Sequence, residues 1–94
     1  MRASRVDTNQ ADIVDAFRAH GCTVLHLHSV GGGCPDLLVG YYGENYLVEI
    51  KTLKGKLNKL QQLWHEDWLG AVDVVHSIEE AERLVHRWTV WCVP

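Results

Sequence analysis

The stretch GGGCPDLLVGYYGENYLVEIK, residues 31–51, places three charged side chains within two apolar runs. Asp36 opens the run DLLVGYY, and Glu49 and Lys51 close the run NYLVEIK. Charged groups seldom lie inside apolar strands without a partner or a task. Both runs are rich in strand-forming residues, and a turn signal around YGEN joins them. We therefore predict an antiparallel hairpin.

Side chains alternate between the faces of a strand, so Glu49 and Lys51 share one face. A turn centred between Tyr42 and Gly43 would set the register of the hairpin. In that register Asp36 lies directly opposite Glu49, and Lys51 lies on the same surface. Side chains opposed in this way have Cβ atoms about 4.5–5.5 Å apart. A register shift of one residue would separate the three groups.

Two neighbouring carboxylates repel each other unless a positive charge lies between them. A hard divalent cation such as Mg²⁺ is usually held by one or two carboxylates together with waters and substrate phosphate. A neighbouring lysine could stabilise charge on a phosphoryl group or help to deprotonate a water. The alternative is a surface salt bridge between Lys51 and either carboxylate, which is common and worth little energy.

The rest of the chain predicts an α/β sheet with helices on its faces, in the order α-β-β-β-α-β-α. Helices are expected at residues 8–20, from residue 58 to Gly70 and at residues 77–88, and further strands at 22–28 and 71–76. Asn58 is the expected cap of the second helix, and Ser77 with Glu80 forms a capping box for the third. The apolar tail TVWCVP could add a final strand.

The composition of the 94 residues, 47% of them apolar, indicates a single domain over residues 1–94. No apolar run approaches the roughly 20 residues that span a membrane. The segment MRASRVDTNQAD lacks the apolar part of a signal peptide, so we expect a cytoplasmic protein. The three cysteines are widely spaced without a CxxC pair, which argues against a disulfide framework or a zinc site.

The net charge of −3 does not by itself indicate a nucleic-acid-binding protein. The basic residues are unevenly distributed, however. Four of the nine, Lys51, Lys54, Lys56 and Lys59, fall in a segment that contains no acidic residue. Taken alone, such a lysine cluster is typical of a solvated loop.

A Pro-Asp pair, a hairpin and then Glu-x-Lys at a strand end resembles the PD-(D/E)XK nuclease superfamily. The pattern GGGCPDLLVG…YLVEIK, followed by a helix that contains Gln, resembles the VRR-NUC family within it. The similarity is strongest to its small stand-alone members from phages and bacteria, and it extends roughly over residues 5–85. The resemblance implies a restriction-endonuclease-like core, a mixed sheet flanked by helices.

The resemblance also implies roles for residues of the hairpin. Asp36 and Glu49 would be the acidic metal ligands. The backbone carbonyl of Ile50 would be a further ligand, and Lys51 would be the catalytic lysine.

Two family positions match this sequence with some ambiguity. The glutamine on the helix after the hairpin matches Gln61, with the adjacent Gln62 as an alternative. Many members carry a glutamate on the first helix, where this sequence offers Asp7, Asn9 or Asp12 instead. Asn9 is our choice for this metal-binding position, and the departure from glutamate leaves a second metal open.

The activity implied by the resemblance is hydrolysis of DNA phosphodiester bonds with Mg²⁺ or Mn²⁺, on branched or junction DNA, in a bacterial or phage-infected cell. Lys54, Lys56 and Lys59 would contact the DNA backbone, and Gly32 and Gly33 would let it approach. Small relatives often act as dimers, so we expect a homodimer in which a second protomer covers the apolar tail.

Two alternatives to an active nuclease remain. The same fold could be a catalytically weak or inactive DNA-binding module. The chain could also be an unrelated α/β interaction domain with a chance Glu-x-Lys.

Overall fold

The computed structural model describes the backbone of residues 2–92 and the side chains of residues 9–90. The predicted α/β class and element order are both confirmed. The elements are α1 (Arg2–Ala19), β1 (Thr23–His26), β2 (Leu37–Tyr41), β3 (Glu44–Ile50), α2 (Lys59–Asp67), β4 (Val72–Val75) and α3 (Ile78–Cys92). The strands form one mixed sheet in the order β1-β2-β3-β4, antiparallel except for the parallel pair β3–β4.

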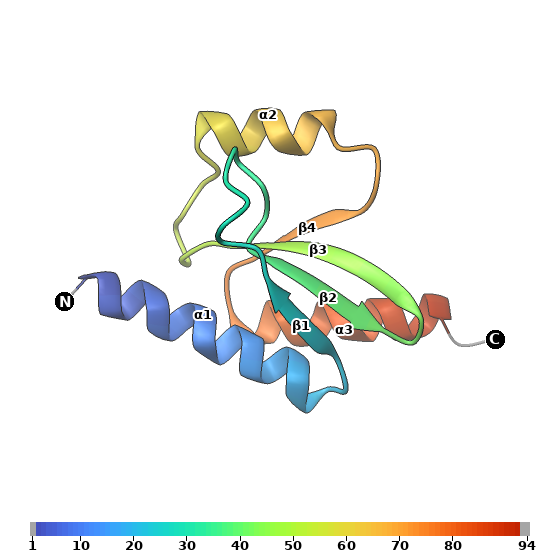
Figure 1. Cartoon of the computed structure of the whole chain (residues 1–94). Coiled ribbons are helices and arrows are strands. Elements are labelled where there is room, and N and C mark those ends of the chain that lie inside the picture. The colour runs from blue at the N-terminus through green and yellow to red at the C-terminus, as the bar shows by residue number, and fades with distance from the viewer. Residues whose placement is uncertain (1, 93–94) are drawn as a thin grey trace.

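Helices α1 and α3 cover one face of the sheet, and α2 lies over the opposite face (Figure 1). The core fills the space beneath α1 and α3. Its fully buried members include Ile13, Phe17, Leu37, Val39, Val48 and Ala81. Helix α2, by contrast, contributes no buried residue, so the core does not fix its position. None of the helices described is long and apolar enough to cross a membrane.

The predicted register of the hairpin is confirmed. Tyr42 and Gly43 form the two-residue turn with φ values of 47° and 82°, as a type I′ turn requires. The pairs run from Tyr41 with Glu44 to Leu37 with Val48. One further step along this ladder brings residue 36 opposite residue 49.

The expectation that TVWCVP forms a strand is wrong, because α3 continues to Cys92. Trp88, in the preceding turn, is only 4% exposed, and its ring stacks on Tyr46 with centroids 3.9 Å apart. Thr89 holds the next turn, donating to the Val85 carbonyl and bonding the Tyr41 hydroxyl. Trp88 is thus covered by its own chain; the side chains of Trp91 and Val93 lie outside the described residues.

Two further helix boundaries and one helix cap differ from those expected. Helix α1 begins at Arg2 rather than near residue 8, and α2 ends at Asp67, before Gly70. At α3 the Glu80 backbone N–H bonds to the Ser77 hydroxyl, but the Glu80 carboxylate accepts from the backbone N–H of His76 instead of Ser77. The capping box is therefore shifted by one residue, because the same carboxylate oxygen also bonds His76 Nδ1.

Two substitutions test the turn. Gly43→Ala should lower the free energy of unfolding by about 1–2 kcal/mol, since a side chain at positive φ carries roughly that cost. Tyr42→Asn should raise the free energy of unfolding, because Asn tolerates left-handed backbone. Urea denaturation measures both. A Gly43→Ala midpoint equal to that of the wild type would contradict the turn geometry.

Candidate functional site

Asp36 and Glu49 meet at the open end of the hairpin, as the register requires. The backbone N–H of Ile50 donates to Asp36 Oδ2 at 2.8 Å, which holds the Asp36 carboxylate against β3. Glu49 points away from the face that carries Val48, because alternate residues of β3 face opposite ways. Its side chain is nevertheless only 1% exposed.

Helix α2 supplies the hydrogen-bond partner of this buried carboxylate. Gln61 Nε2 donates to Glu49 Oε2 at 3.1 Å. Gln62 turns elsewhere, and its Nε2 donates to the Leu57 carbonyl at 3.0 Å. Of the two glutamines left open by the sequence, Gln61 is the one that the structure brings to Glu49.

The second oxygen of Glu49, Oε1, is buried and has no hydrogen-bond partner among the described residues. The pKa of Glu49 is raised from its ordinary 4.5 to about 8, and burial is the largest cause. The charge of Asp36, and the hydrogen bond that the two carboxyl groups share when one is protonated, contribute to this rise in pKa, and the charge of Lys51 opposes it. A buried, unsatisfied carboxylate beside a second one needs a proton or a cation.

The donors present fit a hard divalent cation. Asp36 and Glu49 supply carboxylate oxygens, and the Ile50 carbonyl lies between Glu49 and Lys51 in the chain. Oxygen donors of this kind suit Mg²⁺ or Mn²⁺. Within residues 9–90, no three His, Cys, Asp or Glu side chains gather as a metal cluster, so a cation at this site would depend on the two carboxylates together with backbone oxygen and water.

The first helix reaches this end of the sheet through Asn9. Asn9 Nδ2 donates to the Lys51 backbone carbonyl at 3.4 Å. Of the other two candidates on this helix, Asp12 is exposed and the side chain of Asp7 lies outside the described residues. The structure thus brings Asn9 to the backbone of the Glu-x-Lys segment.

Cys34 borders the site, a position that the sequence did not predict. Burial raises the pKa of its thiol, and the charges of Glu49 and Asp36 raise it further. The thiol therefore lies within the electrostatic field of both carboxylates. Its position two residues before Asp36 was the only signal in the sequence.

The glycine loop holds α2 in place. Gly33 has φ of 86°, and a Cβ at this position would lie 2.5 Å from the Leu60 carbonyl oxygen and 3.2 Å from the Gln61 nitrogen. A side chain cannot fit there without moving the helix. A Cβ on Gly32 would meet nothing within 4 Å, so only Gly33 has this packing role.

The lysines expected to contact DNA lie on the segment that joins β3 to α2. Lys54, Lys56 and Lys59 are exposed, and none makes an ion pair within residues 9–90. They follow Lys51 directly in the chain and lead into the helix that carries Gln61. The lysine segment therefore begins next to Glu49, at the end of β3, and ends at α2, whose Gln61 bonds Glu49.

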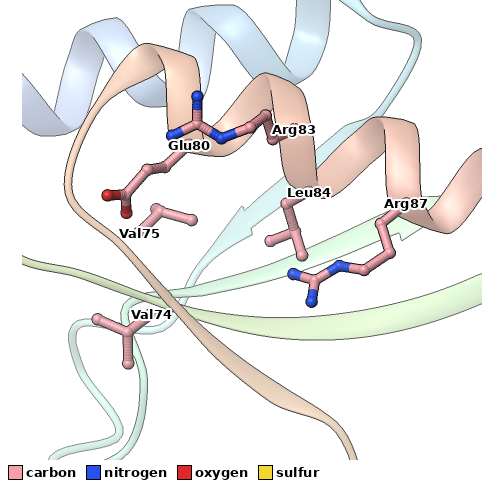
Figure 2. Close-up of a pocket in the computed structure, with 6 residues that line it drawn as sticks. All are labelled: Val74, Val75, Glu80, Arg83, Leu84 and Arg87. Carbon is pink, nitrogen blue, oxygen red and sulfur yellow. The ribbon is translucent and has the colours of Figure 1, made fainter.

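A cavity of about 480 Å³ lies between β4 and α3, and no candidate site residue lines it (Figure 2). Figure 2 shows Arg83 and Arg87 along α3, with Glu80 at one end. Arg87 lies 3.8 Å from Asp73, and Glu80 bonds His76. Charges of both signs therefore line this cavity.

Raising the pH should destabilise the protein in the absence of metal. The folded state of Glu49 binds a proton up to a pKa of about 8, whereas the unfolded chain releases it near 4.5, so stability falls as pH rises through this window. Glu49→Gln cannot ionise and should flatten that dependence in urea denaturation with a chelator. The exposed Glu66→Gln is the matched control; identical pH profiles for the two variants would contradict the assignment.

Comparisons with known proteins give one informative match. No protein-family model matches the chain, and no curated protein matches it. A solved structure described as a VRR_NUC domain superimposes with a TM-score of 0.70 at 28% identity, covering 88% of this chain and 96% of that one. The resemblance to the VRR-NUC family that the sequence predicts is confirmed by this structural neighbour.

Proposed function

We propose that this protein is a metal-dependent endonuclease that hydrolyses DNA phosphodiester bonds. One observation carries the proposal most directly: within the described part of the chain, Glu49 Oε1 is buried beside Asp36 without a hydrogen-bond partner, at the end of the strand that continues into Lys51. The nuclease fold shared with the VRR_NUC domain supports the same reading.

Asp36, Glu49 and the Ile50 carbonyl would hold Mg²⁺ or Mn²⁺. When bound, such an ion polarises a phosphate and lowers the pKa of a water. The remaining roles belong to side chains of the protein. The Lys51 ammonium offsets negative charge that grows on the phosphoryl oxygens, and Gln61 holds Glu49 in one orientation. Lys54, Lys56 and Lys59 bind the DNA backbone without reading its sequence. The space around Gly32, where a Cβ would meet nothing within 4 Å, leaves room for a DNA strand.

The role of Lys51 is tested by cleavage of branched and duplex DNA with Mg²⁺ or Mn²⁺. Lys51→Ala should reduce kcat by about 100-fold or more, the usual cost of losing a transition-state charge partner. Lys54→Ala, on the exposed segment, should mainly weaken binding and reduce its salt dependence. Equal trace activity in the wild type and Lys51→Ala would overturn the nuclease proposal, whereas preference for branched DNA would extend it.

A second candidate function is a DNA-binding module of the same fold without turnover. It is favoured by Asn9, which offers the site an amide where many family members have a carboxylate. Two acidic ligands then remain, which lowers the negative charge available to a cation.

Calorimetric titration with Mn²⁺ separates the two functions. An active nuclease should bind Mn²⁺, and Asp36→Asn should abolish the heat of binding. Asp12→Asn, an exposed change on α1, is the control and should leave it intact. Absence of Mn²⁺ binding by the wild type, together with retained DNA binding, would favour the module over the enzyme.

We also propose that the protein acts as a homodimer, which presents two sites to two DNA strands. The exposed apolar side chains of α2 and the residues after it support a further packing surface: Leu60, Leu63, Trp68 and Leu69 are 55%, 46%, 45% and 100% exposed. Sedimentation equilibrium measures the assembly directly, and a monomer at all concentrations would contradict this proposal.

A further inference from the structure

The Gln61 side chain makes two hydrogen bonds of opposite polarity. Its Oε1 accepts from the backbone N–H of Asn58 at 3.0 Å, while its Nε2 donates to Glu49 Oε2 at 3.1 Å. An amide has its acceptor on one atom and its donors on the other. The N–H of Asn58 therefore determines which end of the Gln61 amide faces the Glu49 carboxylate.

The first bond belongs to a complete capping box. Asn58 Oδ1 accepts from the Gln61 backbone nitrogen at 2.9 Å, so the two residues satisfy each other across the first turn of α2. Gly33 lies against the same turn from the loop side, where a Cβ would clash with the Leu60 carbonyl. This turn is consequently held from two sides, although α2 buries no side chain.

The direction of the amide matters for Glu49. With Nε2 towards it, one carboxylate oxygen is occupied and the other, Oε1, has no hydrogen-bond partner among residues 9–90. With the amide reversed and Glu49 ionised, as cation binding requires, Gln61 Oε1 would face Glu49 Oε2, two acceptors would repel, and the Asn58 N–H would lose its acceptor. Groups that orient a metal-binding carboxylate typically change metal affinity by about 10–100-fold when they are lost.

We propose that Asn58 is a positioning residue whose backbone N–H, by holding Gln61 Oε1, sets the Glu49 carboxylate for cation binding. The cap of α2 is thereby part of the site, although Asn58 touches neither carboxylate. This inference rests on the proposed metal-dependent function, but the orientation of the amide can be measured without it.

Two substitutions of Asn58 separate its side chain from its backbone N–H. Asn58→Ala removes Oδ1 and keeps the N–H, whereas Asn58→Pro removes both. The φ of −77° at this position lies within the range of proline. Both variants lose the side-chain cap, so the loss of helix stability that they share cancels in the comparison. Gln62→Ala is the control, because the side-chain amide of this neighbouring glutamine donates to the Leu57 carbonyl and not to Glu49.

Two readouts apply to these variants. Mn²⁺ titration should give Asn58→Ala an affinity close to that of the wild type and Asn58→Pro an affinity about 10-fold weaker or more. In the metal-free protein, the ¹⁵N resonance of the Gln61 side-chain amide should move in Asn58→Pro and remain in Asn58→Ala and Gln62→Ala. Circular dichroism verifies that both Asn58 variants are folded.

Equal Mn²⁺ affinities and an unmoved amide resonance in the two Asn58 variants would overturn the proposal. A wild type that binds no Mn²⁺ would instead refute the proposed function. In that case the ¹⁵N resonance of the Gln61 side-chain amide still tests the role of Asn58. A shift confined to Asn58→Pro supports orientation of the amide by the Asn58 N–H, and the absence of a shift refutes this orientation.

Discussion

The structure depends on one constraint, the two-residue turn that sets the register of the β2–β3 hairpin. Because Tyr42 and Gly43 fill this turn, Asp36 falls opposite Glu49 and not opposite a neighbour on the other face. A slip of one residue would turn Glu49 away from Asp36 and Val48 out of the core. The packing under α1 and α3 and the carboxylate pair are thus specified by the same register.

The carboxylate pair is costly to the protein when no cation is bound. Burial, first, and the neighbouring Asp36 carboxyl raise the pKa of Glu49, and one of its oxygens lacks a hydrogen-bond partner among residues 9–90. Natural proteins retain such an arrangement where it serves function. Here Lys51, Gln61 and the Ile50 N–H each reduce the cost, and the proposed cation would reduce it further. Stability and the candidate chemistry therefore oppose each other at Glu49.

The elements and the hairpin register could be predicted because they follow from local signals. Strand alternation, the turn and the Asn58 cap of α2 are all contained in short stretches of sequence. The identity of the glutamine was also accessible: with Asn58 as the cap, Gln61 occupies the third helical position, where a capping box places its partner. Gln62 points about 100° further around the helix and cannot replace it.

Other features could not be predicted because they arise from tertiary contacts. The run after Trp88 is short and apolar, a pattern that strands and buried helices share, and contact with Tyr41 and Tyr46 makes it helical. The fit of Gly33 against α2 depends on a helix that is far away in sequence. The position of Cys34 beside the carboxylates likewise follows from how the loop folds, since a thiol in a loop carries no signal of its neighbours.

The most direct test of the account is a crystal structure of the protein soaked with Mn²⁺, with the metal located by its anomalous scattering. We predict a Mn²⁺ ion between Asp36 and Glu49, bonded to Glu49 Oε1 and the Ile50 carbonyl at about 2.0–2.2 Å, near the distances of Mg²⁺ sites. Gln61 Nε2 should still donate to Glu49 Oε2. An anomalous peak elsewhere, or none at saturating Mn²⁺, would contradict the claim that this hairpin end is a metal-dependent active site.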